Sequence, residues 1–168
     1  MYEFALRDGL TQAFNKKYLM NHVKAEFSFA KRHKSPLSVI FLDVDGFSSI
    51  NETYGHLAGD SVLVEVTKIS MTMIRLEDTF ARYGGEEFVV VCRGTRSDQA
   101  ILLAERLRRQ IEETTFRYGG QPIPITVSMG IASYPELSIE RSEELIEAAD
   151  TAMYKAKRAG RNCVLIAN

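Results

Sequence analysis

Two adjacent glutamates follow two adjacent glycines in the stretch RYGGEEFVVV, residues 82–91. Like charges side by side repel, and glutamate is depleted in strands, so Glu86 and Glu87 are unexpected just before an apolar run that is typical of a buried strand. A second pair of acids, Asp43 and Asp45, lies at the end of the apolar run LSVIFLDV. Two or three carboxylates at one edge of a sheet offer the hard oxygen ligands that Mg²⁺ takes together with water and substrate phosphates. These acids are therefore candidates for a magnesium site.

Each feature also has an ordinary structural explanation. The aspartates could be the solvated end of a strand, and the glutamates could belong to a polar turn. Gly84 and Gly85 permit positive φ and the close approach of another molecule, but a two-residue hairpin loop needs such residues as well. The combination of acids and glycines favours a site if the two strands are neighbours.

Residues that suit phosphate groups occur near these acids. The segment GFSSINETYGHLAGD, residues 46–60, is rich in small and polar residues, and such loops can present backbone N–H groups to a phosphate. Lys157 and Arg161 could neutralise a polyphosphate, or they could only complement the dipole of a helix that ends there. The formal net charge of −1 argues against a broad nucleic-acid footprint and against strong attraction to an anionic membrane. We expect a local phosphate site, and neither a nucleic-acid nor a membrane partner.

The elements that must position these residues alternate along the chain. Apolar residues at helical spacing predict helices from about 11 to 32, 58 to 74, 97 to 111 and 142 to 159. Apolar, β-branched runs predict strands at about 37–44, 79–83, 86–92, 125–132 and 163–167, the second and third joined by a hairpin at the two glycines. This order predicts an α/β fold of the α+β sandwich type, with a mixed central sheet and helices on its faces.

Size and composition set the broad class. The 168 residues, of which 45% are hydrophobic, fit one domain over residues 1–168, and the abrupt beginning suggests a piece excised from a longer protein. Cys92 and Cys163 lack a CxxC spacing, which favours reduced thiols over a disulfide or zinc site. No apolar run approaches the roughly 18 residues of a membrane span, and the first ten residues lack a signal-peptide core. A soluble, cytoplasmic domain is expected.

Five motifs occur along the chain: RDGLTQAFN (7–15), FLDVDGF (41–47), INETYGHLAGD (50–60), GGEEF (84–88) and AMYKAKRAGRN (152–162). Their order and spacing resemble those of the GGDEF family, the bacterial diguanylate cyclases. The match runs from about residue 8 to 162. The resemblance implies a fold like that of nucleotide cyclases and polymerase palm domains, with the signature on a glycine-rich hairpin. It also implies that two GTP molecules are condensed into cyclic di-GMP, with release of two pyrophosphates, at a homodimer interface.

The resemblance also implies roles for particular residues. Asp43, Glu86 and the carbonyl of Val44 would hold Mg²⁺ or Mn²⁺, and Glu87 would be a ligand or the base for the attacking 3′-hydroxyl. The metal ions would polarise the α-phosphate and orient the nucleophile.

The remaining roles concern the nucleotide. Asn51 and Asp60 would read guanine, and adenine would leave their acceptors unpaired. Phe47 and Ser48 would offer backbone N–H groups to the phosphates. Lys157 and Arg161 would neutralise the outer phosphates.

Two further features of the sequence bear on activity, one residue and one short motif. Ser48 stands where the family usually has a lysine that is thought to stabilise charge on the reacting phosphates, which predicts slow turnover. Arg75 and Asp78 match the family's RxxD inhibitory motif, which implies feedback by cyclic di-GMP, although an ordinary i,i+3 ion pair explains them too. The alternative to an enzyme is a GGDEF-like sensor of GTP or cyclic di-GMP that has lost turnover. In either case the domain would work in the bacterial cytoplasm, and the full-length protein could be membrane-anchored.

Overall fold

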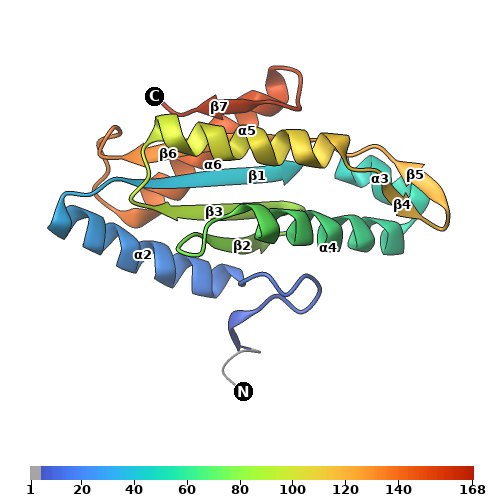
Figure 1. Cartoon of the computed structure of the whole chain (residues 1–168), viewed down its shortest axis with the longest axis horizontal. Helices are drawn as coiled ribbons and strands as arrows, with labels where there is room; N and C mark the ends of the chain where they lie inside the picture. Colours follow the sequence, from blue (N-terminus) through green and yellow to red (C-terminus); the bar gives the residue numbers. More distant parts are fainter. Residues whose placement is uncertain (1–4) are drawn as a thin grey trace.

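The computed structural model describes residues 5–168 and centres on a sheet of five strands in the order β2-β3-β1-β6-β7 (Figure 1). The strands are β1 (Leu37–Val44), β2 (Thr79–Gly84), β3 (Glu87–Arg93), β6 (Val127–Tyr134) and β7 (Val164–Ile166). The helices are α2 (Lys16–His33), α3 (Phe47–Tyr54), α4 (His56–Met73), α5 (Ser97–Glu113) and α6 (Ser142–Arg158). Two short strands, β4 (Phe116–Tyr118) and β5 (Gln121–Ile123), form a separate hairpin. The mixed sheet with flanking helices confirms the expected fold class.

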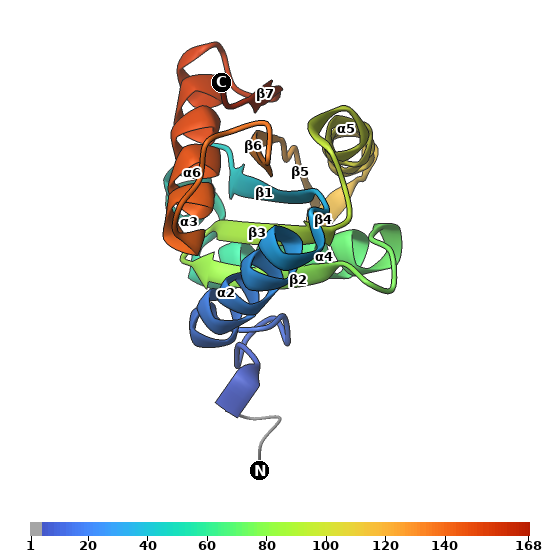
Figure 2. The ribbon, with the colours of Figure 1, turned by 90° about the vertical axis from the view of Figure 1, so that its left-hand side faces the viewer.

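Helices cover both faces of the sheet (Figure 2). On one face, Val39 and Phe41 of β1 pack in a core with residues of α2 and α6, such as Leu19 and Leu145. On the other face, alternate residues of β1 join a second core with α4 and α5. All eight residues of β1 are buried, which explains why its sequence is a continuous apolar run rather than an alternating one. Within residues 5–168 no helix is both long enough and apolar enough to cross a membrane.

The pairing of β1 with its neighbours decides which acids meet. β1 is antiparallel to both β3 and β6, whereas β6 and β7 are parallel. The register places Asp43 directly opposite Glu87. The hairpin loop consists of Gly85 and Glu86, one residue later than the two glycines predicted, because Gly84 still pairs with Glu87. Gly85 has φ 50°, a conformation that glycine adopts without the strain of a Cβ.

Three features of the structure differ from the sequence prediction. The segment expected to be a loop after β1 contains the eight-residue helix α3, which lacks a side-chain N-cap. The hairpin of β4 and β5 was not predicted, because its strands have only three residues each. The predicted helix from residue 11 begins at Lys16 instead, where Asn15 caps it by accepting a hydrogen bond from the Tyr18 N–H.

Candidate active site at the ends of two strands

The acids of the signature meet those of the first strand at one end of the sheet. Asp43 lies near the end of β1, and Glu87 begins β3 on the facing position. The Val44 N–H donates to the Glu86 carbonyl at 3.2 Å, which holds the hairpin loop beside the end of β1. The predicted convergence of these carboxylates is therefore present.

The electrostatics of this cluster favour bound positive charge. Burial, and then the negative charges of Asp43, Asp150 and Glu86, raise the pKa of Glu87 to about 7. Burial also raises the pKa of Asp43, against the opposing effect of the Lys157 ammonium. Both carboxyls are therefore easier to protonate than usual, even with Lys157 beside Asp43, so further positive charge would stabilise their ionised forms.

Sequence reasoning missed Asp150. It lies on α6 and contributes to the negative charge around Glu87. A signal was available, because Asp150 precedes Lys157 by seven residues, or two helical turns, and such residues share one face of a helix. Knowing that this face turns toward β1 would have placed Asp150 near the site.

Lys157, which was predicted to neutralise phosphate, lies beside two carboxylates of the site. Its Nζ lies 2.8 Å from Asp43 Oδ1 and 3.2 Å from Asp45 Oδ1, so it pairs with acids. The contact with Asp43 is an ion pair by distance alone, since Asp43 Oδ1 is buried and accepts no well-aligned hydrogen bond from residues 5–168. The ammonium stands where a cation is needed, in reach of a metal or of phosphate.

The donor set fits a magnesium-type ion completed by substrate. Within residues 5–168 no group of three or more His, Cys, Asp or Glu residues is placed to hold a metal. Mg²⁺ commonly takes only one or two protein carboxylates and fills its octahedron with water and phosphate oxygens. Asp43 and Glu86, with the carbonyl of Val44, could supply such a partial set.

Asp45, by contrast, is fully used within the protein. Its side chain is 6% exposed and accepts hydrogen bonds from the hydroxyls of Thr126 and Ser128 and from the Asn162 N–H, besides its contact with Lys157. It has no free position for a metal. Its role is to organise the site.

A pocket of about 330 Å³ opens between α3 and α4 and is lined by Ser48, Asn51, Glu52 and His56. Asn51 Oδ1 is buried and finds no hydrogen-bond partner in the described chain. Such an unpaired amide oxygen is costly, and it points at Gly59 of α4 rather than into the open pocket. A Cβ at Gly59 would overlap the Asn51 side chain, so glycine permits this close approach of α3 to α4. Asp60, half-buried, follows Gly59 on α4 but does not line the pocket.

The start of α3 offers further donors. Its first backbone bond runs from the Ile50 N–H to the Gly46 carbonyl at 3.1 Å. The N–H groups of Phe47, Ser48 and Ser49 therefore have no acceptor within the helix, as at every helix N-terminus. Arg161 is exposed in the turn after α6. These groups lie near the acids because α3 follows β1 directly and α6 packs over it.

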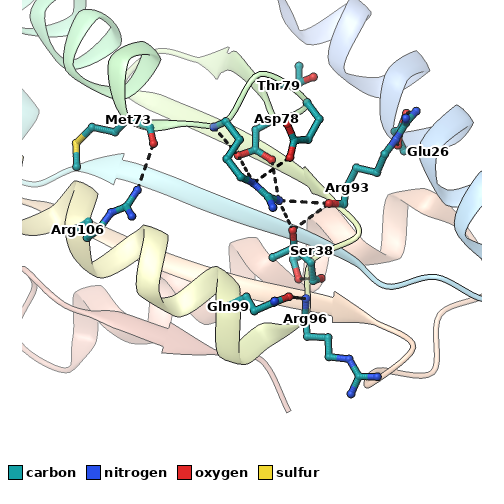
Figure 3. A network of polar contacts seen from close by, with 12 residues as sticks. Glu26, Ser38, Met73, Asp78, Thr79, Arg93, Arg96, Gln99 and Arg106 are labelled. Carbon is teal, nitrogen blue, oxygen red and sulfur yellow. Dashed lines mark hydrogen bonds and ion pairs between the residues drawn. The ribbon is translucent and has the colours of Figure 1, made fainter.

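Arg75 lies at the opposite end of β3, beside Arg93. Figure 3 shows Asp78 and Arg93 at this end. The Arg75 guanidinium pairs with Asp78 at 3.3 Å and also donates to the Arg93 carbonyl and the Thr95 hydroxyl. Asp78 has a fully buried side chain, whereas Arg75 is half exposed and lines a small pocket of about 220 Å³ with residues of α5. The ordinary i,i+3 ion pair is thus present, and the exposed guanidinium edge leaves room for a ligand.

The family model described as "Diguanylate cyclase, GGDEF domain" matches residues 5–163. The chain belongs to the GGDEF family. Among curated relatives, it is 41% identical over 170 residues to diguanylate cyclase A of Treponema denticola, covering 99% of this chain and 45% of that protein. It is 38% identical over 161 residues to diguanylate cyclase DosC of Escherichia coli, covering 94% of this chain and 34% of that protein. The chain thus spans less than half the length of these relatives.

Solved structures agree with this assignment. The GGDEF domain of DgcB from Caulobacter crescentus, solved in complex with c-di-GMP, superposes with a TM-score of 0.92 at 30% identity, covering 98% of this chain and 94% of that one. The active GGEEF domain of a diguanylate cyclase from Vibrio cholerae gives a TM-score of 0.85 at 34% identity, covering 92% and 97%. The Vibrio domain is described by the same five-letter variant of the signature that this chain carries. Domains of this family are nucleotidyltransferase-type cyclases that work with a divalent metal ion.

Proposed function

We propose that this chain condenses two GTP molecules into cyclic di-GMP and releases two pyrophosphates. The observation that carries the proposal is the carboxylate cluster in which Asp43 faces Glu87 and the pKa values of both carboxyls are raised, in a chain of the GGDEF family. A structural turn would gain nothing from such repulsion, whereas a metal–phosphate site uses it. The pocket that Ser48 and Asn51 line supports a nucleotide as the substrate.

The residues divide the work as follows. Asp43, Glu86 and the Val44 carbonyl would hold Mg²⁺, or Mn²⁺, which when bound supplies positive charge to the α-phosphate. Glu87 accepts the proton of the 3′-hydroxyl as the general base.

The nucleotide is held from both ends. Asn51 and Asp60 accept hydrogen bonds from guanine, and the first N–H groups of α3, at Phe47 and Ser48, bind phosphate. Lys157 lies beside Asp43. We propose that Lys157 and Arg161 neutralise the charge of the outer phosphates. Each domain binds one GTP, so two domains must face each other, and we infer that catalysis needs a homodimer.

Regulation would take place at the other end of the sheet. We infer that cyclic di-GMP binds at Arg75 and Asp78 and lowers the rate. The half-exposed guanidinium and the pocket it lines support this site. We further propose that residues 1–168 act as one domain of a longer bacterial signalling protein and that this domain works in the cytoplasm, where GTP is available.

The alternative is a sensor that binds GTP or cyclic di-GMP without turnover. Ser48 favours it, because the family usually has lysine there and because Ser48 lines the nucleotide pocket without bringing a charge. The intact acids favour the enzyme.

Product formation separates the two functions. The chain is incubated with GTP and Mg²⁺ and the products are identified by mass, with the Asp43→Asn variant and ATP as controls. We expect the parent chain to form cyclic di-GMP from GTP and no corresponding product from ATP. The Asp43→Asn variant should form none. The rate of the parent should rise more than linearly with protein concentration. Asp60→Ala should weaken GTP binding and narrow the preference over ATP. GTP binding without product would establish the sensor, and equal affinity for ATP would refute the guanine site.

A further inference from the structure

The turn that follows α6 has an unusual backbone. Gly160, Arg161 and Asn162 have φ values of 118°, 67° and 49°. The helix closes with a Schellman arrangement, in which the Arg161 N–H donates to the Ala156 carbonyl at 3.1 Å. Glycine suits such an end, but two further residues with a Cβ in the left-handed region are uncommon. Contacts outside the turn must hold Arg161 and Asn162 in place.

Asn162 makes those contacts. Its N–H donates to Asp45 Oδ2 at 3.0 Å, its Nδ2 donates to Glu112 Oε2 at 2.6 Å, and its Oδ1 accepts from Arg108 at 3.0 Å. Both Arg108 and Glu112 belong to α5, a helix that otherwise contributes nothing to the site. The side chain of Asn162 therefore ties the turn to a rigid element.

Arg108 is itself held firmly. Its side chain is 14% exposed and pairs with Glu105 at 3.1 Å and with Glu112 at 3.3 Å, one turn away on either side. An arginine fixed by two carboxylates is a more rigid partner for Asn162 than a free surface side chain. The neighbouring Arg109 offers a contrast, because it is 68% exposed and only approaches Glu105 at 3.8 Å.

Asp45 extends the connection to the second cation. The same buried carboxylate that accepts from the Asn162 N–H also contacts Lys157 at 3.2 Å and is anchored to β6 through Ser128 at 2.6 Å. Lys157 and the turn that carries Arg161 are thus fixed to one point of the sheet.

We propose that Asn162, held by Arg108 and Glu112, is a positioning residue that directs Arg161 at the outer phosphates of GTP. The inference rests on the proposed function, because it assumes that Arg161 contacts those phosphates. Asn162 does not touch the nucleotide in this scheme. It fixes the backbone turn that carries Arg161, so this turn loses less conformational freedom on binding.

Two substitutions separate the effect of the Asn162 backbone conformation from the effect of its side-chain contacts. Asn162→Gly removes the side-chain contacts to α5 but keeps the left-handed backbone conformation accessible. Asn162→Ala removes the same contacts and also disfavours that conformation. With Mg²⁺ present, we expect either variant to bind GTP about tenfold more weakly, the lower end of the effect of outer-shell partners, and Asn162→Ala to be the weaker of the two. Binding of GMP, which lacks the outer phosphates, should be unchanged. Equal losses for GTP and GMP would mean general damage to the fold and would overturn the proposal.

A double-variant cycle tests whether Asn162 acts through Arg161. Arg161→Ala combined with Asn162→Gly should bind GTP no more weakly than Arg161→Ala alone, and additive losses would contradict the scheme. Arg108→Met should reproduce the Asn162→Gly effect, while the control Arg109→Met should not. If the unsubstituted chain bound no GTP, the proposed function would fail together with this inference. If it bound GTP and the Asn162 variants bound it equally well, only the positioning role would fail.

Discussion

The two ends of β3 bury acids in opposite ways. At one end, Asp43 and Glu87 face each other, and burial with their mutual repulsion raises the pKa of Glu87 to about 7. At the other end, Asp78 is fully buried but receives the Arg75 guanidinium and its backbone N–H, the latter at 2.9 Å. There the hydrogen bond to Asp78 raises the pKa of Arg75, so the pair stabilises its own charges. The first end gathers more carboxylates than Lys157 can balance and is suited to a further cation, whereas at the second end Arg75 already pairs with the buried acid.

This difference shows how to separate function from stability in the chain. Unpaired, perturbed carboxyls gather at functional sites because their cost is offset only when a ligand binds. A paired and satisfied acid stabilises the fold directly. Substitutions that remove charge should therefore have opposite consequences at the two ends.

The largest expected effect is the loss of turnover in Glu87→Gln. The amide keeps the volume but can neither accept the 3′-hydroxyl proton nor attract a metal, and we expect the rate of cyclic di-GMP formation to fall by about 100-fold or more. The free energy of unfolding should not decrease, because the substitution relieves repulsion. Turnover is measured by product formation and stability by urea unfolding. An active Glu87→Gln variant would remove Glu87 from the mechanism.

The sequence predicted the acids of the site better than their surroundings. The run LSVIFLDV predicted β1 with its observed bounds, because a strand buried on both faces has mostly apolar residues without an alternating pattern. The meeting of Asp43 with Glu87 followed from assuming that β1 and the hairpin are neighbours, which the register confirms.

What the sequence could not provide depends on tertiary contacts. The helix α3 was missed because GFSSINETY carries few apolar residues and no side-chain cap, so its stability comes from packing on α4 at Gly59. The contacts of Asn162 with α5 join residues about 50 positions apart, and no local pattern encodes them.

A second prediction concerns the effect of an added positive charge near the Asp43–Glu87 end of the sheet. Ser48 lies in the first turn of α3 and lines the nucleotide pocket. Ser48→Lys should raise turnover by roughly tenfold or more, since one preorganised donor at reacting phosphates commonly contributes that much, with little change in GTP affinity. Ser49→Lys is the matched control, because Ser49 is equally exposed but does not line the pocket. Equal rates for both variants and the parent would show that a missing lysine does not limit the enzyme.

A third prediction concerns the other end of β3, where Arg75 pairs with Asp78. Asp78→Asn weakens the charge-assisted bonds from Arg75, and we expect it to lower the free energy of unfolding by about 1.5–3 kcal/mol while leaving GTP turnover intact. Feedback by cyclic di-GMP should be lost. Glu77→Gln serves as the control: Glu77 also approaches Arg75, at 3.4 Å, but its side chain is 49% exposed, so its removal should change stability by less than about 1 kcal/mol. If Asp78→Asn were as stable as the parent, the contrast between the two ends would not hold.

The smallest effect is a pH dependence of stability that arises from the catalytic end alone. In the folded protein without metal the pKa of Glu87 is about 7, above its ordinary value of 4.5. Between these values the folded state holds a proton that the unfolded state has released, so the contribution of Glu87 to stability falls as pH rises through this window. Glu87→Gln lacks this loss, and its melting temperature should exceed that of the parent at about pH 8 but match it near pH 4.5. Saturating Mg²⁺ should stabilise the parent more than the variant at the higher pH, because the ion replaces the proton as the source of positive charge. If the difference in melting temperature between the parent and Glu87→Gln did not change with pH, the pKa of Glu87 would not be raised in the folded protein. The proposed contrast between the Asp43–Glu87 end and the Arg75–Asp78 end would then fail.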